Sequence, residues 1–138
     1  MRYERRKELK NHSAAELAKT LTHFDPEYPV WIQHVDSIYP VIGISSEIIN
    51  DMISLESEET YGNKPSRTIL SKDLIEELNN IIKNYDESDD VEICAEATCN
   101  PDKTLDMQLT DPCTFAAVES YSCTKSIYLI TGTPVVYC

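Results

Sequence analysis

The chain has 138 residues, 24 of them acidic and 12 basic, and its formal net charge is −12. A chain of this length forms one folded domain, and a charge so far from neutral repels nucleic acid and anionic membranes while it attracts basic protein surfaces. Three glycines exclude a glycine-rich phosphate loop, and no catalytic or cofactor motif is present, so we expect a protein that is not an enzyme and uses no cofactor.

Residues 1–12 form a basic leader ahead of the predicted single domain, residues 13–138. The leader contains five of the twelve basic residues, Arg2, Arg5, Arg6, Lys7 and Lys10, so the rest of the chain is strongly acidic. It either extends the helix that follows or stays loose, and it pairs with the protein's own acidic surface or with nothing. The leader lacks the apolar stretch of a secretory signal, and no later window is apolar enough to span a membrane, which predicts a cytoplasmic protein without a membrane partner.

The first predicted helix begins at Ala14 and ends at the Asp25-Pro26 pair. Ser13 and Glu16 have the spacing of a capping box, in which each side chain bonds the backbone N–H of the other residue. The apolar residues of this helix recur at helical spacing and form one stripe: Ala14, Leu17, Ala18, Leu21 and Phe24. We expect the stripe to pack on a sheet.

Two adjacent antiparallel strands are predicted next, at residues 28–35 and 39–44, because both segments are rich in branched and aromatic residues. Val30 and Ile32 share one face of the first strand, and we expect them to point into the core. Residues 45–69 are ambiguous. Their apolar residues between 48 and 55 fit a short helix, which a polar loop follows.

A stronger helix is predicted after Ser71, which we expect to be its N-cap. The apolar residues of this helix occupy one face: Leu74, Ile75, Leu78, Ile81, Ile82 and Tyr85. The acidic run at 86–90 ends the helix and is typical of a solvated connector. Beyond it, turn signals separate five predicted strands at 91–97, 105–109, 115–121, 126–131 and 134–137.

These elements predict an α+β fold. We expect a mainly antiparallel sheet of five or six strands, with two or three helices packed on one face.

The cysteines and histidines do not form a recognisable site. The five cysteines are an odd number in a chain without an export signal, which favours free, buried thiols: Cys94, Cys99, Cys113, Cys123 and Cys138. Their spacing contains no close pair, and the three histidines add no ligand pattern, so no metal site is predicted. A small enzyme that uses Cys and His is the alternative, because thiol and imidazole need be neighbours only in space.

The acidic residues lead to the functional prediction. If those in and beside the two least sheet-like segments line one face, they imitate the charge of a nucleic-acid backbone and fit a basic groove on a host protein or nucleoprotein complex. The candidate partner-binding residues are Glu56, Glu58, Glu59, Glu76, Glu77, Asp86, Glu87, Asp89 and Asp90. The same charge argues against direct binding of duplex nucleic acid. The competing interpretation is an ordinary solvated surface.

Residues 13–32 combine a capped helix, an Asp-Pro turn and a strand, and residues 38–44 add a strand that contains Tyr39-Pro40-Val41. This order resembles the opening of small uncharacterised proteins of bacteriophages and prophages, over residues 13–44 only. The resemblance implies a phage-encoded inhibitor, of anti-CRISPR or anti-restriction type, that blocks a host defence complex in the bacterial cytoplasm. A phage structural or assembly protein is a further candidate, and a homodimer is left open.

Overall fold

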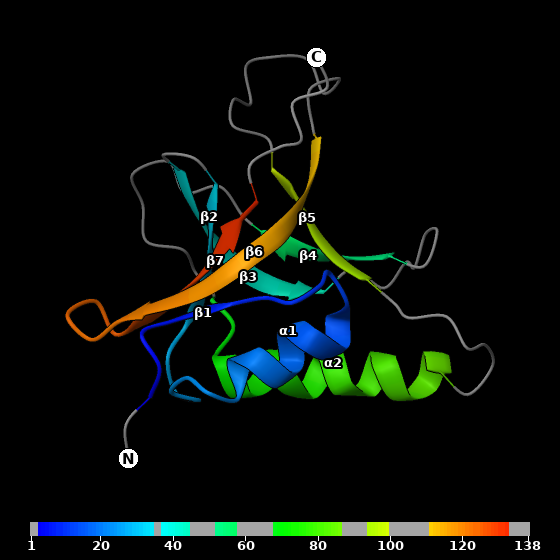
Figure 1. Cartoon of the computed structure of the whole chain (residues 1–138), viewed down its shortest axis with the longest axis horizontal. Helices are drawn as coiled ribbons and strands as arrows, with labels where there is room; N and C mark the ends of the chain where they lie inside the picture. The colour runs from blue at the N-terminus through cyan, green and yellow to red at the C-terminus, as the bar shows by residue number, and fades with distance from the viewer. Residues whose placement is uncertain are drawn as a thin grey trace.

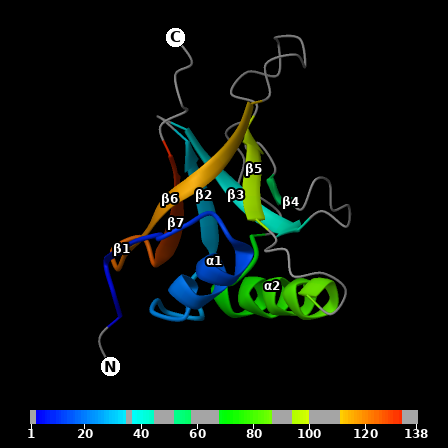
Figure 2. The same ribbon diagram turned by 45° about the vertical axis from the view of Figure 1, so that its right-hand side comes forward.

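The computed structural model describes residues 3–34, 37–44, 52–57, 68–86, 94–99 and 111–132 (Figure 1). Two helices and seven strands succeed one another in these residues. In chain order they are β1 (Arg6–Glu8), α1 (Ala14–Leu21), β2 (Val30–His34), β3 (Ser37–Ile44), β4 (Met52–Ser57), α2 (Ser71–Asp86), β5 (Cys94–Cys99), β6 (Asp111–Tyr121) and β7 (Ser126–Thr131). The two helices lie together beneath the curved sheet in both views (Figures 1 and 2).

The strands form one mixed sheet in the order β1-β6-β5-β4-β3-β2-β7, and β6 also pairs with β7. Because of this extra pairing, the six strands from β2 through β7 form a closed ring. The β2–β7 and β4–β5 pairs are parallel. The predicted α+β class is confirmed, but the sheet has seven strands rather than five or six and is mixed. A parallel pair needs a crossover connection, and α2 lies in the connection from β4 to β5.

The core lies between the two helices and the inner side of the sheet. Leu17 and Leu21 of α1 and Leu74 and Leu78 of α2 are fully buried there, which confirms the predicted apolar stripes. The sheet contributes alternate residues, among them Val30, Ile32, Ile53, Ile127 and Leu129. The predicted inward orientation of Val30 and Ile32 is therefore correct.

The start of α1 differs in one detail from a complete capping box. Ser13 is the N-cap, and its hydroxyl accepts the backbone N–H of Glu16. The N–H of Ser13 donates to the side chain of Asn11 instead of Glu16, and the Glu16 carboxylate accepts the hydroxyl of Thr20. The helix ends at Leu21, before the predicted boundary, yet Phe24 is buried in the core after a tight turn.

Ser71 is not a side-chain cap. It is the first residue of α2, and its buried hydroxyl has no hydrogen-bond partner. The backbone N–H groups of Ser71 and Lys72 donate to the carbonyls of Tyr28 and Pro26, at 2.9 and 3.0 Å. The turn before β2 thus satisfies the N–H groups that a cap would otherwise bond.

Two segments have a different structure from the one the sequence favoured. The predicted helix between residues 48 and 55 is wrong for residues 52–55, which belong to strand β4 (Met52–Ser57), and its first residues lie outside the described part of the chain. Ile53 and Leu55 are buried there while Met52 and Glu56 are not, so the apolar residues follow the period of a strand. The leader neither extends α1 nor stays loose in its described part, because residues 6–8 form β1 on the edge of β6.

Several predicted strands are tested only in part. Strand β5 begins at Cys94, and β6 and β7 contain the strands predicted at 115–121 and 126–131. The strands predicted at 105–109 and 134–137 lie outside the described residues.

Candidate partner-binding surface

A groove of about 540 Å³ lies between α2, the segment that leads into it, and the outer side of β3. We call it the acidic groove, and define it by its lining residues: Ile42, Thr68, Ile69, Leu70, Asp73, Glu76, Glu77 and Asn80. Three of these side chains are carboxylates from one helix, and three are apolar side chains. The groove therefore combines negative charge with an apolar wall.

The spacing of the groove residues on α2 explains their common direction. Asp73, Glu76, Glu77 and Asn80 stand at i, i+3, i+4 and i+7, which is one face of an α-helix. All four are exposed, whereas Leu74 and Leu78 bury the opposite face against the sheet. The same packing that fixes α2 on the core thus directs its acids outward.

Strand β4 brings a fourth carboxylate to this place. Burial raises the pKa of Glu77 above its ordinary value, and the negative charges of Asp73, Glu56 and Glu76 raise it further. Glu56 is exposed on β4, far from α2 in sequence, and its negative charge nevertheless contributes to the raised pKa of Glu77. Repulsion of this kind marks a site of concentrated negative charge.

The acids around Glu77 have no cationic partner among the described residues. The ion pairs in those residues join Arg6 to Glu8, Arg6 to Glu119 and Lys72 to Glu27. The first two belong to β1 and β6, and the third joins the start of α2 to the turn before β2. The ion pairs of the described residues therefore do not involve the carboxylates that line the groove.

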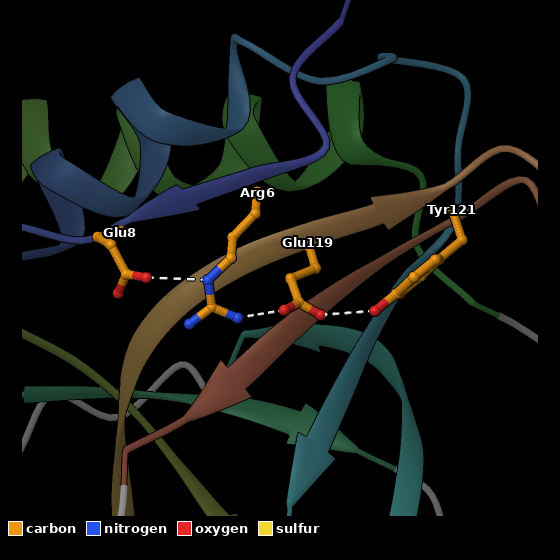
Figure 3. Close-up of polar contacts among 4 residues, drawn as sticks. All are labelled: Arg6, Glu8, Glu119 and Tyr121. Atoms are coloured by element: carbon orange, nitrogen blue, oxygen red, sulfur yellow. Dashed lines mark hydrogen bonds and ion pairs between the residues drawn. The ribbon is translucent and has the colours of Figure 1, made fainter.

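The described leader uses its charge elsewhere. Arg6 donates to the carboxylates of Glu8 and Glu119, and the hydroxyl of Tyr121 donates to Glu119 at 2.8 Å (Figure 3). These contacts raise the pKa of Arg6, with the hydrogen bond to Glu8 as the first cause. Ser120 adds a backbone N–H bond to the carbonyl of Arg5 at 2.8 Å. The leader thus pairs with acids of its own edge of the sheet, and its described bases do not neutralise the groove.

The structure gathers only some of the predicted site residues. Glu56, Glu76 and Glu77 are exposed, Glu76 and Glu77 line the acidic groove together, and the charge of Glu56 contributes to the raised pKa of Glu77. Asp86 is the last residue of α2. The remaining predicted acids lie outside the described residues: Glu58, Glu59, Glu87, Asp89 and Asp90.

The sequence-based set missed Asp73 and Ile42. Asp73 could have been found from its spacing, since it precedes Glu76 and Glu77 on the same helical face. Ile42 carried no such signal. It stands where the pairing of β3 with β4 shifts register between Val41 and Gly43, and a bulge of this kind re-aims a side chain.

Other site types have little support in the described residues. There, no group of three or more His, Cys, Asp or Glu side chains could hold a metal ion. Cys94 is half-buried, whereas Cys123 is an exposed thiol, so the expectation of buried cysteines is wrong for Cys123. Neither of the two described helices is long and apolar enough to cross a membrane.

Comparisons with known proteins add no relative. No family model matches the chain, and neither the curated proteins nor the solved structures gave a match.

The raised pKa of Glu77 predicts a pH-dependent effect of Glu77→Gln. A carboxyl whose pKa is higher in the folded state opposes folding above that pKa, and this penalty fades as the pH falls towards the unfolded value of about 4.3. Because Glu77 is exposed, we expect the variant to be more stable at pH 7 by less than about 0.5 kcal/mol. Urea unfolding at pH 7 and pH 4 measures the difference. An equal gain at both pH values would contradict the repulsion.

Proposed function

We propose that this protein is a non-catalytic binding module that presents the acidic groove to a basic surface of another protein. One observation carries the proposal: Asp73, Glu76 and Glu77 line one groove beside an apolar wall, and none of them forms an ion pair among the described residues. Carboxylates that repel one another in the free protein are relieved when a cation binds between them.

The lining of the groove suits lysine and arginine side chains. Such side chains have long aliphatic stems that pack on apolar surface while the charged end stays among polar groups. Ile42, Ile69 and Leu70 supply the apolar wall, and Asp73, Glu76 and Glu77 supply acceptors for the charged end. Complementary charge also steers the encounter of two proteins, an effect that falls as the salt concentration rises.

In its finer form, the proposal makes the partner a nucleic-acid-handling protein, such as a host defence complex blocked by a phage-encoded inhibitor. A protein surface that binds phosphates through lysine and arginine also binds clustered carboxylates, because both are anions that accept charge-assisted hydrogen bonds. The support for phage origin is the resemblance of residues 13–44 to phage and prophage proteins.

The double substitution Glu76→Lys/Glu77→Lys tests the groove directly, with an octa-arginine peptide as the probe. We expect it to weaken binding by about 10-fold at low salt, because it replaces two attractions with two repulsions. It should also flatten the dependence of the dissociation constant on salt. Isothermal titration calorimetry at low and at moderate salt measures both quantities.

The matched control is Glu4→Lys/Glu8→Lys, which changes the net charge by the same amount in and beside β1, at residues that do not line the groove. Both residues are exposed, and the ion pair lost at Glu8 is a surface pair of small energetic value. If the control weakens peptide binding as much as the groove variant does, then total charge decides binding, and the groove is not the site.

A further inference from the structure

A row of paired residues crosses five strands on the outer side of the sheet, opposite the core. Arg6 of β1 pairs with Glu119 of β6, Glu119 with Tyr128 of β7, Tyr128 with Trp31 of β2, and Trp31 with Pro40 of β3. On β6, β7 and β2, neighbours of the row are buried in the core, namely Val118, Leu129 and Val30. The row therefore runs from an ion pair at one edge to an aromatic and apolar middle.

Part of this side is apolar and aromatic. We call it the outer face, and define it as Ile38, Ile42, Trp31, Tyr128 and Tyr121. Ile38 is 47% exposed, Tyr121 is 46% exposed and Ile42 is 38% exposed. The rings of Tyr121 and Tyr128 meet edge to face, with centroids 5.6 Å apart. Only Tyr3, among the large apolar side chains that the structure describes as exposed, lies outside this face.

The outer face adjoins the acidic groove. Ile42 belongs to both, since it lines the groove and stands two residues from Pro40 along β3. At the far end, the positive charge of Arg6 is taken up by Glu8 and Glu119 (Figure 3). A surface with an apolar centre and a charged margin has the composition of a protein interface.

The charge of the chain selects the occupant. A second copy of this chain would bring another net charge of −12 to the same place, and the two acidic grooves would repel each other. A partner with basic side chains beside apolar ones complements both surfaces at once. Tyrosine and tryptophan give such a contact large area at a low cost in side-chain entropy.

We infer that the outer face and the acidic groove are two parts of one interface, and that its ligand is a protein segment in which basic and apolar side chains alternate. This inference rests on the proposed function, and it adds that apolar contact, rather than charge alone, selects the partner. A ligand that offers only positive charge engages the groove and leaves the outer face empty.

Two synthetic peptides of equal length and charge test this, one alternating arginine with leucine and the other arginine with serine. We expect the arginine–leucine peptide to bind about 10-fold more tightly, because its leucine side chains are removed from water when they pack on the outer face. Trp31, the single tryptophan of the chain, reports the contact. Its emission should change with the arginine–leucine peptide and stay nearly constant with the arginine–serine peptide.

Substitutions separate the two parts of the interface. Ile38→Ser/Ile42→Ser should reduce the preference for the arginine–leucine peptide to less than about 2-fold, because both exposed side chains lose their apolar contact. Glu76→Lys/Glu77→Lys should weaken both peptides by the same factor and leave the preference intact. Tyr3→Ala tests the cleft beside β1, which the exposed Tyr3 lines together with Tyr121 of the outer face, and it should leave most of the preference intact.

Each contrary result has a distinct meaning. If the isoleucine variant keeps the full preference while the lysine variant loses affinity for both peptides, the outer face is not part of the interface, and the proposed function stands. If Tyr3→Ala removes the preference instead, the peptide occupies the cleft, and this inference is wrong. If the lysine variant binds both peptides as well as the native protein, the proposed function fails as well. Sedimentation of the protein without peptide tests for a dimer. If a dimer forms and Ile38→Ser/Ile42→Ser dissociates it, the outer face binds a second copy of the chain, and this inference is wrong.

Discussion

Replacing Leu78 with alanine is expected to lower the free energy of unfolding by about 2–5 kcal/mol, the range for removing a fully buried leucine side chain. Leu78 has no exposed surface and belongs to the core cluster beneath the sheet. The loss should lower the urea concentration at the midpoint of unfolding and leave the dependence of the unfolding free energy on urea concentration unchanged. The melting temperature should fall by roughly 3–5 °C for each kcal/mol lost.

Asn79→Ala is the matched control for this substitution. It changes the next residue of α2, which is exposed, so its effect should stay within about 0.5 kcal/mol. Leu78 also holds the helical face that carries Glu76 and Glu77, so the alanine variant should weaken the binding of octa-arginine near its melting temperature. Equal stabilities of the two variants would show that α2 is not packed on the sheet through Leu78.

Ile53→Ala is expected to have an effect of similar size, about 2–5 kcal/mol. Ile53 is fully buried on β4, where it faces the core between the neighbouring strands. Met52, its neighbour, is only half-buried because successive residues of a strand point to opposite sides. Met52→Ala should therefore cost less than Ile53→Ala, and chemical denaturation of the two variants measures the difference.

This pair of substitutions also distinguishes the strand from the helix that the sequence favoured. In a helix the two side chains would stand about 100° apart on neighbouring parts of one surface, and both could face the core. A cost for Met52→Ala that equals or exceeds the cost for Ile53→Ala would contradict strand β4. Glu56 would then lose the element that places it beside Glu77.

The sequence predicted the elements whose signals are local. The apolar stripes of α1 and α2 repeat at the helical period over several turns, and β2 and β3 follow each other with a short connection between them. Strand β4 lacked such a signal, because its few apolar residues fit either period. Its pairing with β5 is parallel and crosses α2, so the partner that decides the structure is distant in the chain.

Strand β1 could not be predicted for a different reason. Arg6, Lys7 and Glu8 are charged, and such residues are depleted in strands. They form a strand because β6 offers a free edge, and charged side chains are common on edge strands. The composition of the leader shows that it is basic, but it does not show that the leader pairs with the edge of β6.

The sequence predicted that the candidate site is acidic, but it did not predict which residues line the site. Glu76 and Glu77 of α2 and Glu56 of β4 were all predicted as site residues because the sequence has an excess of acidic residues. Their meeting depends on the crossover from β4 through α2 to β5, which no local pattern reveals. The contribution of Ile42 depends on a bulge in β3, and the aromatic row depends on the register of four strand pairs.

The closure of the sheet by β6 and β7 has a consequence for how the chain folds. Val30 pairs with Ile127, and Arg6 pairs with Glu119, so β1 and one side of β2 pair with strands that lie far later in the sequence. The pairs β1–β6 and β2–β7 cannot form before β6 and β7 have been synthesised. Because loop closure over such separations is slow, we expect folding in roughly the millisecond-to-second range.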